Sequence, residues 1–161
     1  MTSGVFFYYN WCEYTLGNCI NMVSLKSHYG LRAIVALAAN YGKGHMQAKE
    51  IAAQQDIPVR YLELLLSQLR RARMVDAIRG KNGGYVLFQK PNKISVWDVV
   101  TVFEGKIIFA QTESPAGNKK TPGAYLSLWK EAEKKMVDYL KSVKISALLE
   151  AVSKGKDTHF V

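Results

Sequence analysis

Residues 48–89 decide the fold, and their sequence is AKEIAAQQDIPVRYLELLLSQLRRARMVDAIRGKNGGYVLFQ. Residues 48–55 predict a short helix that buries Ile51 and Ala52, and the chain turns directly after it. Pro58 suits the first turn of a further helix, because the missing N–H of proline costs no hydrogen bond there. Leucines recur in that helix at i, i+3, i+4 and i+7, which predicts one apolar stripe. The stripe is Leu62, Leu65, Leu66 and Leu69.

The face of this helix opposite the leucine stripe is polar and partly basic. At about 100° per residue, it consists of Arg60, Glu63, Leu64, Ser67 and Arg71. Side chains of these types can donate to, accept from or touch the edges of bases. A short helix, a tight turn and a second helix with such a face indicate a helix-turn-helix. The alternative is an ordinary helical pair with a solvated face.

Two short β-prone runs follow, at residues 75–79 and 85–89, joined by GKNGG at 80–84. The glycines permit the positive φ angles of a hairpin tip and allow the backbone to come close to a phosphate. A helix-turn-helix followed by a basic-tipped hairpin is a winged helix. Arg79 and Lys81 would suit the minor groove, whose narrow form attracts arginine. An unremarkable hairpin with a solvated lysine is the alternative.

Helices are also predicted on both sides of this segment. Residues 29–40 have the helical spacing, Ser95 and Asp98 form a capping-box pattern that opens a helix ending at Gly105, and residues 111–124 have the polar composition of a loop. A last long helix is predicted from about residue 125 to 143. Its apolar residues recur at intervals of three and four: Leu126, Trp129, Ala132, Met136, Leu140 and Val143.

This last helix predicts a dimer. A small winged-helix core cannot easily cover so long a helix, whereas two copies would bury each other's stripes and place two recognition helices on one duplex. Packing on its own domain is the alternative. The predicted fold is therefore mainly α with a small β-hairpin wing: a winged helix-turn-helix plus a long C-terminal dimerisation helix.

Charge points to the same segment of the chain. The 161 residues include 22 Lys and Arg against 13 Asp and Glu, a net charge of +9. Residues 22–93 hold twelve of the basic and four of the acidic residues, which is the footprint of a chain that meets a polyanion. A solubilising surface would also explain the charge. With two cysteines and no long apolar stretch, we expect a cytoplasmic, nucleoid-associated protein without a membrane partner.

Four regions are predicted along the chain. Residues 1–21 are aromatic and lack a helical period, so we expect an extension that is poorly ordered or not native, with Met22 as the start of a shorter product. Residues 22–105 form the winged helix-turn-helix, 106–124 a loop, and 125–161 the dimerisation helix and a C-terminal tail. The spacing of Cys12 and Cys19 matches no standard zinc site.

The residues resemble those of bacterial winged-helix transcription regulators of the IscR, NsrR and CymR type, the Rrf2 family. The resemblance covers about residues 23–149. It rests on LKSHYGLR at 25–32, Ile51-Ala52, Tyr61-Leu62-Glu63 leading to Leu69-Arg70, Arg79-Gly80 leading to Gly83-Gly84-Tyr85, Ile94-Ser95-Val96 and Leu128-Trp129.

The resemblance implies a homodimer that binds double-stranded DNA at a palindromic operator and regulates transcription, with a repressor as our expectation. The family's recognition-helix pair matches Arg60 and Glu63, and its wing arginine matches Arg79. Glu63 could accept from cytosine N4, Arg60 would suit a guanine or a phosphate, and Leu64 is a departure toward apolar character. The expected DNA-binding residues are Lys26, Tyr29, Arg60, Tyr61, Glu63, Leu64, Ser67, Arg70, Arg71, Arg79, Gly80, Lys81, Asn82 and Gly83.

The chain departs from the cluster-binding members of this family. These use three cysteines and a further ligand in the loop before the long helix, whereas residues 106–128 here contain no Cys or His and only Glu113 as a carboxylate. Thiolates hold iron–sulfur clusters, so we expect no cluster, no metal site and no cofactor. An effector, either a small molecule or a protein partner, is not specified by the sequence.

Three other functions compete with DNA binding. An enzyme is not expected, since the three histidines are scattered and the chain has no nucleophile-elbow, zinc-protease or phosphate-loop motif. An RNA-binding module is suggested by Gly80–Gly83, which mimics the clamp of KH domains. In a KH domain that clamp joins two helices, whereas here strands are predicted. A protein-interaction module would show no salt-sensitive duplex binding.

Overall fold

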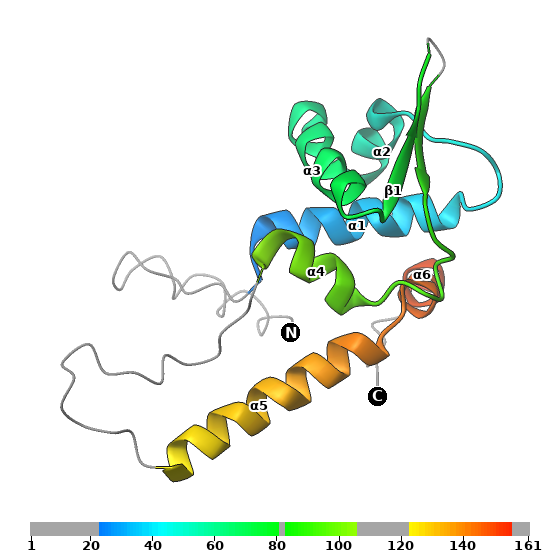
Figure 1. The fold of residues 1–161 in the computed structure, drawn as a ribbon. Helices are drawn as coiled ribbons and strands as arrows, with labels where there is room; N and C mark the ends of the chain where they lie inside the picture. The colour runs from blue at the N-terminus through cyan, green and yellow to red at the C-terminus, as the bar shows by residue number, and fades with distance from the viewer. Residues whose placement is uncertain (1–22, 81–82, 106–122, 156–161) are drawn as a thin grey trace, which may run out of the picture.

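The structure is a computed structural model that describes residues 23–80, 83–105 and 123–155. Its described part is mainly helical with one antiparallel hairpin (Figure 1). The elements are α1 (Leu25–Ala39), α2 (Ala48–Gln55), α3 (Val59–Arg71), β1 (Val75–Ile78), β2 (Gly84–Leu87), α4 (Val96–Glu104), α5 (Gly123–Ser142) and α6 (Ile145–Ser153). The predicted winged helix is confirmed, and the residues predicted as the N-terminal extension and most of the 106–124 loop lie outside the described part.

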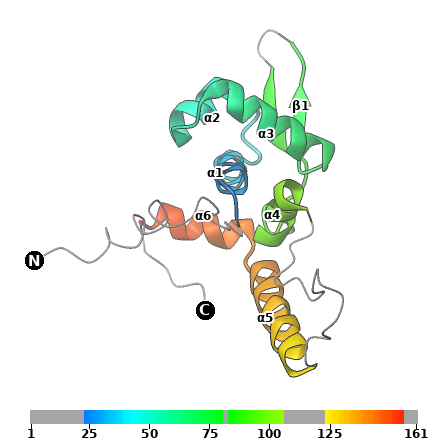
Figure 2. The ribbon, with the colours of Figure 1, turned by 90° about the vertical axis from the view of Figure 1, so that its left-hand side faces the viewer.

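Helix α1 is the centre of the core. Viewed nearly along its axis, α2, α3 and the hairpin lie on one side of α1, and α4 and α6 lie on the other (Figure 2). Burial from two sides explains why every residue from Ala33 to Ala38 is buried, rather than only the single face that the spacing predicts. The helix also begins at Leu25, four residues before the predicted start.

The predicted leucine stripe anchors α3. Leu62, Leu65, Leu66 and Leu69 are each at most 1% exposed, and burial of a leucine side chain contributes roughly 1.5–3 kcal/mol. Helix α2 has the predicted bounds. Pro58 is the residue just before the first turn of α3 rather than a member of that turn, which is a shift of one position from the prediction. Asp56 ends α2 with a φ of 48°, so the chain reverses in a short space.

The hairpin is held to the helix-turn-helix by backbone hydrogen bonds. Its strands pair from Val75 opposite Leu87 to Ile78 opposite Gly84, which is shorter than predicted. Met46, just before α2, exchanges two backbone hydrogen bonds of 3.0 and 2.8 Å with Tyr85. A Cβ at Gly84 would lie 2.5 Å from the carbonyl oxygen of Met46, so only glycine allows this close approach. The wing is therefore fixed relative to the start of α2.

Two side-chain networks fix α4. Ser95 and Asp98 form the predicted capping box, in which Asp98 N–H donates to Ser95 Oγ at 3.2 Å and Ser95 N–H donates to Asp98 Oδ2 at 2.8 Å. At the other end, Glu104 accepts hydrogen bonds from Ser24 N–H at 2.7 Å and Ser27 Oγ at 2.5 Å. These bonds join the end of α4 to the beginning of α1.

The C-terminal region differs from the prediction of a helix followed by a tail. Residues 145–153 form α6, which packs against α1 with Ile145 fully buried. Its apolar residues Ile145, Leu148, Leu149 and Val152 follow the i, i+3, i+4, i+7 spacing. This spacing is typical of a helix, so α6 could have been predicted from the sequence. Val143, predicted inside the long helix, lies just beyond it, and its carbonyl accepts from Val96 N–H at 2.9 Å.

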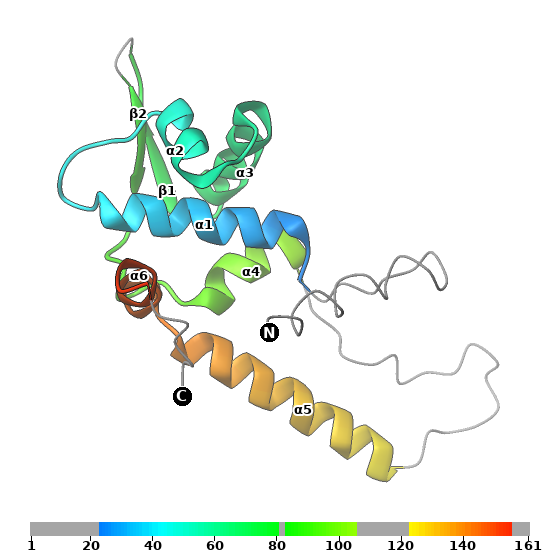
Figure 3. The same ribbon diagram turned by 180° about the vertical axis from the view of Figure 1, so that it is seen from behind.

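Helix α5 stands apart from the core. It packs mainly against α4, no residue on it is buried, and its N-terminal half projects away from the other described elements (Figures 1 and 3). No described helix combines the length and the apolar character needed to cross a membrane.

The network at Glu104 makes stability depend on pH. Partial burial raises the pKa of Glu104, but the hydrogen bonds from Ser24 and Ser27 and the charge of Lys26 lower it by more, so the pKa lies below its usual value. A carboxyl with a lower pKa in the folded state stabilises the fold above its unfolded pKa of about 4.3. That contribution is lost as the pH falls through the lower folded pKa.

Glu104→Gln should therefore lower the free energy of unfolding at neutral pH by about 1 kcal/mol, and this difference should shrink on acidification below about pH 4. Urea unfolding at a series of pH values measures both effects. Glu131→Gln is the matched control, because its ion pair with Lys135 on α5 is exposed and such pairs contribute little. Parallel pH profiles for the wild type and Glu104→Gln would contradict the assignment.

Candidate nucleic-acid interface

The predicted outer face of α3 is exposed in the structure. We call Arg60, Glu63, Leu64, Ser67 and Arg71 the recognition face, and all five are exposed. Leu64 is 62% exposed. Arg70 is exposed as well. Because the leucines fix the rotation of α3 about its axis, they also fix which side chains face outward.

The hairpin stands on the same side of α1 as α3, and its described part extends past the ends of α2 and α3 (Figure 1). Arg79 and Gly80 follow β1 and are exposed. Gly83 N–H donates to the carbonyl of Gly80 at 3.0 Å across the end of the described hairpin, and Gly80 has a φ of 124°. Lys81 and Asn82, predicted to contact DNA, lie outside the described residues.

A surface hollow of about 400 Å³ lies between the recognition face and the hairpin. We call it the wing hollow. Its walls come from the start of α2 with Gln47 and Lys49, from α3 with Glu63, and from hairpin residues 77–80 and 83–85. The structure thus brings Glu63 and Arg79 to one site, as the winged-helix interpretation requires, while Arg60 does not line it. Lys49 was not singled out by the sequence, because nothing local places it opposite the hairpin.

The charged groups of the wing hollow have no ionic partners within the described residues. The ion pairs in that part of the chain join Lys135 to Glu131 on α5 and Lys154 to Glu150 on α6. Lys49, Glu63 and Arg79 take part in neither of these pairs, and Lys49 and Glu63 are exposed. Their charges are therefore available to a ligand.

Aromatic and cationic contacts fix α2 and α3 relative to α1. The ring of Tyr29 on α1 meets that of Tyr61 on α3 edge to face, with centroids 6.0 Å apart. The guanidinium of Arg32 lies 5.7 Å from the Tyr29 centroid and donates to the carbonyl of Gln55, the last residue of α2. This chain of contacts joins three helices, and sequence reasoning missed Arg32.

The same contacts bear on two predicted DNA-binding residues. Tyr29 and Tyr61 are half-buried and pack against the core, so both have a structural role, and their contact with DNA stays a prediction. Lys26 is exposed near the beginning of α1, and its contact with DNA also stays a prediction.

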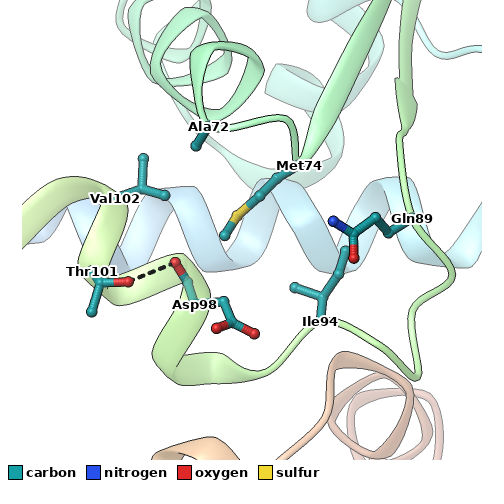
Figure 4. A pocket seen from close by; sticks show the side chains of 7 residues that line it. All are labelled: Ala72, Met74, Gln89, Ile94, Asp98, Thr101 and Val102. Atoms are coloured by element: carbon teal, nitrogen blue, oxygen red, sulfur yellow. Dashed lines mark hydrogen bonds between the residues drawn. The ribbon is translucent and has the colours of Figure 1, made fainter.

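A second hollow of similar size lies between α4 and the turn that follows α3 (Figure 4). Met74, Ile94 and Val102 supply apolar lining, and Asp98 and Thr101 supply polar lining. These polar side chains already form hydrogen bonds within α4. Asp98 caps its first turn, and Thr101 Oγ1 donates to the carbonyl of Asp98 at 3.0 Å. The wing hollow, with its unpaired charges, is the better candidate for a binding site.

Comparison with known proteins gives a consistent result. The pattern of the Rrf2 family, described as an iron-dependent transcriptional regulator, matches residues 23–151. A candidate HTH-type transcriptional regulator of Synechocystis is 36% identical over 130 residues, which cover 78% of this chain and 86% of the relative. The HTH-type transcriptional regulator CymR of Bacillus subtilis is 42% identical over 85 residues, which cover 53% of this chain and 62% of CymR.

Solved structures show the same likeness. The structure of CymR, the global cysteine regulator of B. subtilis, has a TM-score of 0.71 and 33% identity, and the match covers 80% of this chain and 95% of CymR. The structure of T. potens IscR has a TM-score of 0.67 and 31% identity, with 85% and 92% of the two chains covered. These relatives and structural neighbours are regulators rather than enzymes.

The iron dependence in the family description does not fit the metal-ligating side chains that this chain offers. The two cysteines, Cys12 and Cys19, precede the matched residues, so the matched region contains no thiolate. Thiolates are the usual ligands of iron–sulfur clusters. The described residues also contain no group of three or more His, Cys, Asp and Glu side chains arranged to hold a metal ion.

Proposed function

The chain belongs to the Rrf2 family and is a DNA-binding transcriptional regulator with a winged-helix fold, and from this premise we propose that it represses transcription as a homodimer on a palindromic operator. The observation that carries the proposal is the wing hollow, where Glu63 of the recognition face and Arg79 of the wing line one surface. A helix and a hairpin so placed can enter adjacent grooves of one duplex.

Each half of the interface has a distinct task in this proposal. The recognition face enters the major groove, where Glu63 accepts from cytosine N4 and Leu64 contacts a thymine methyl. Arg60, Arg70 and Arg71 donate to phosphates or guanine edges. Arg79 lies at the edge of the minor groove, where the negative potential attracts a guanidinium and its planar fork also reaches a phosphate of the bordering strand. Base contacts specify the operator, and phosphate contacts position the protein on it.

Helix α5 supports the homodimer. Large apolar side chains remain exposed on it, with Tyr125 at 59%, Leu128 at 57%, Trp129 at 42% and Tyr139 at 47%. The predicted stripe residues Leu126, Ala132, Met136 and Leu140 are half-buried and lie on the same side of the helix. A second copy that packs its own α5 on this side would bury both surfaces and create the two-fold symmetry that a palindrome requires.

Repression follows from occupancy in this proposal: a dimer on its operator excludes other proteins from that stretch of DNA. We infer that the chain acts by binding rather than by catalysis and needs no cluster or other cofactor. It would work in the cytoplasm, at the nucleoid. An RNA-binding role through Gly80–Gly83 is less well supported, because β1 and β2 flank this turn, whereas helices flank the KH clamp.

Arg79→Ala should weaken binding to the operator about tenfold, ~1.4 kcal/mol, and leave thermal stability unchanged, because the side chain is exposed at the hairpin end. Fluorescence anisotropy with a duplex selected from a randomised pool measures the affinity. Lys93→Ala is the matched control, since Lys93 is exposed in the turn that follows the opposite end of the hairpin. Wild-type affinity in Arg79→Ala would remove the wing from the mechanism.

Glu63→Ala should relax discrimination at one base pair in each half-site by about 1–3 kcal/mol and leave the other positions as selective as before. Sequencing the duplexes retained by the wild type and by the variant, starting from one randomised pool, gives the preference at every position. Identical preferences for the two proteins would refute a base contact by Glu63.

Trp129→Glu should convert the dimer into a monomer, because it places a charge in the apolar interface. Sedimentation velocity gives the oligomeric state, and far-UV circular dichroism checks that the helices persist. Ser127→Glu adds the same charge to the polar side of α5 and should stay dimeric. A wild type that sediments as a monomer, or a dimer that survives Trp129→Glu, would contradict the assignment.

A further inference from the structure

We propose that the wing hollow is a binding site for a phosphodiester of the DNA backbone, held between Lys49 and Arg79. This inference rests on the proposed function, since it takes the partner to be a duplex. It adds a residue and a ligand group: Lys49, outside the predicted DNA-binding set, becomes a phosphate ligand.

The geometry of a duplex supplies the first argument. One sugar–phosphate strand separates each major groove from the neighbouring minor groove. A protein that inserts a helix into the first groove and a hairpin into the second must let that strand pass between the two elements. The structure has a hollow of about 400 Å³ at that place.

The charges of the hollow supply the second argument. Lys49 and Arg79 are cations without ionic partners in the described residues, and both line the hollow. Lysine and arginine are the usual partners of phosphate oxygens, lysine as a point charge and arginine through its planar fork. Glu63 lines the α3 side of the same hollow and would repel a phosphate. The backbone would therefore lie toward Lys49 and Arg79, which leaves Glu63 to face the bases.

The position of Lys49 within α2 supplies the third, independent argument. Lys49 is the second residue of the helix, where the positive end of the helix dipole disfavours a cation by about 0.3–1 kcal/mol. It is exposed and belongs to neither ion pair found among the described residues, so the fold gains little from its charge. A phosphate ligand in the wing hollow would pair with the charge of Lys49, which does not stabilise α2.

The hairpin side of the hollow allows a phosphate to approach the backbone closely. Gly80 has a φ of 124°, and a Cβ there would meet nothing within 4 Å. The backbone at this point is thus bare on its open side, and a phosphate can come closer to it than a side chain would allow.

Lys49→Gln tests the site. Glutamine keeps the helix propensity of lysine and removes the charge. The variant should bind two probes less tightly by the same several-fold factor: a duplex selected by the wild type from a randomised pool, and an unselected duplex of the same length. The slope of log affinity against log salt should fall by about 1, as expected for one lost phosphate contact. Lys93→Gln, an exposed lysine outside the hollow, should keep the wild-type slope.

A second measurement locates the phosphate. Single methylphosphonate substitutions, which remove one backbone charge each, are scanned along the selected duplex. One position per half-site should weaken Lys49→Gln by a smaller factor than it weakens the wild type, because one of the two partner charges of that phosphate is already gone. The melting temperature of the free variant should equal or exceed that of the wild type, which excludes a structural cause.

The outcomes separate the two proposals. If the wild type shows no salt-dependent duplex binding, the proposed function fails and this site fails with it. If the wild type binds with a steep salt slope and Lys49→Gln keeps that slope, only the phosphate site is overturned. The phosphate site is also overturned if every methylphosphonate weakens the wild type and Lys49→Gln equally.

Discussion

Burial of the leucine stripe of α3 is the constraint on which the rest of the structure depends. Four leucines at i, i+3, i+4 and i+7 are removed from water, and each contributes roughly 1.5–3 kcal/mol. A helix held along one side cannot rotate about its axis, so its opposite side must face solvent. The recognition face is exposed for this reason, and Arg32, Tyr29 and Tyr61 then fix the position of α3 relative to α1 and α2.

The hairpin can contact DNA together with α3 only because it is fixed to the same group of helices. The backbone bonds between Met46 and Tyr85 join it to the start of α2, so Arg79, Lys49 and Glu63 line a common hollow. The hollow is lined by two cations and one carboxylate. In the proposal, the cations attract the DNA backbone and the carboxylate selects bases. Specific and nonspecific affinity would thus come from neighbouring side chains with different tasks.

Local patterns in the sequence predict most of the fold, and long-range contacts account for what they miss. The stripe of α3, the capping box of Ser95 and Asp98 and the glycine-tipped hairpin are set by residues close together in the chain, and the structure confirms them. The contact of Ser24 with Glu104 joins residues 80 positions apart, and no periodicity reveals it. Burial of α1 on both sides and the docking of α6 also depend on packing. The wing hollow belongs to this class, because Lys49 and Arg79 come to line it through long-range contacts such as the pairing of Met46 with Tyr85.

Dimethyl sulfate footprinting on a selected operator tests most directly whether α3 and the wing straddle one strand of DNA. The reagent methylates guanine N7 in the major groove and adenine N3 in the minor groove, so one experiment reports on both. We expect protection of both atoms in adjacent grooves of each half-site, with loss of only the adenine N3 protection when Arg79 is replaced by alanine. Protection confined to one groove, or loss of both signals together in that variant, would contradict it.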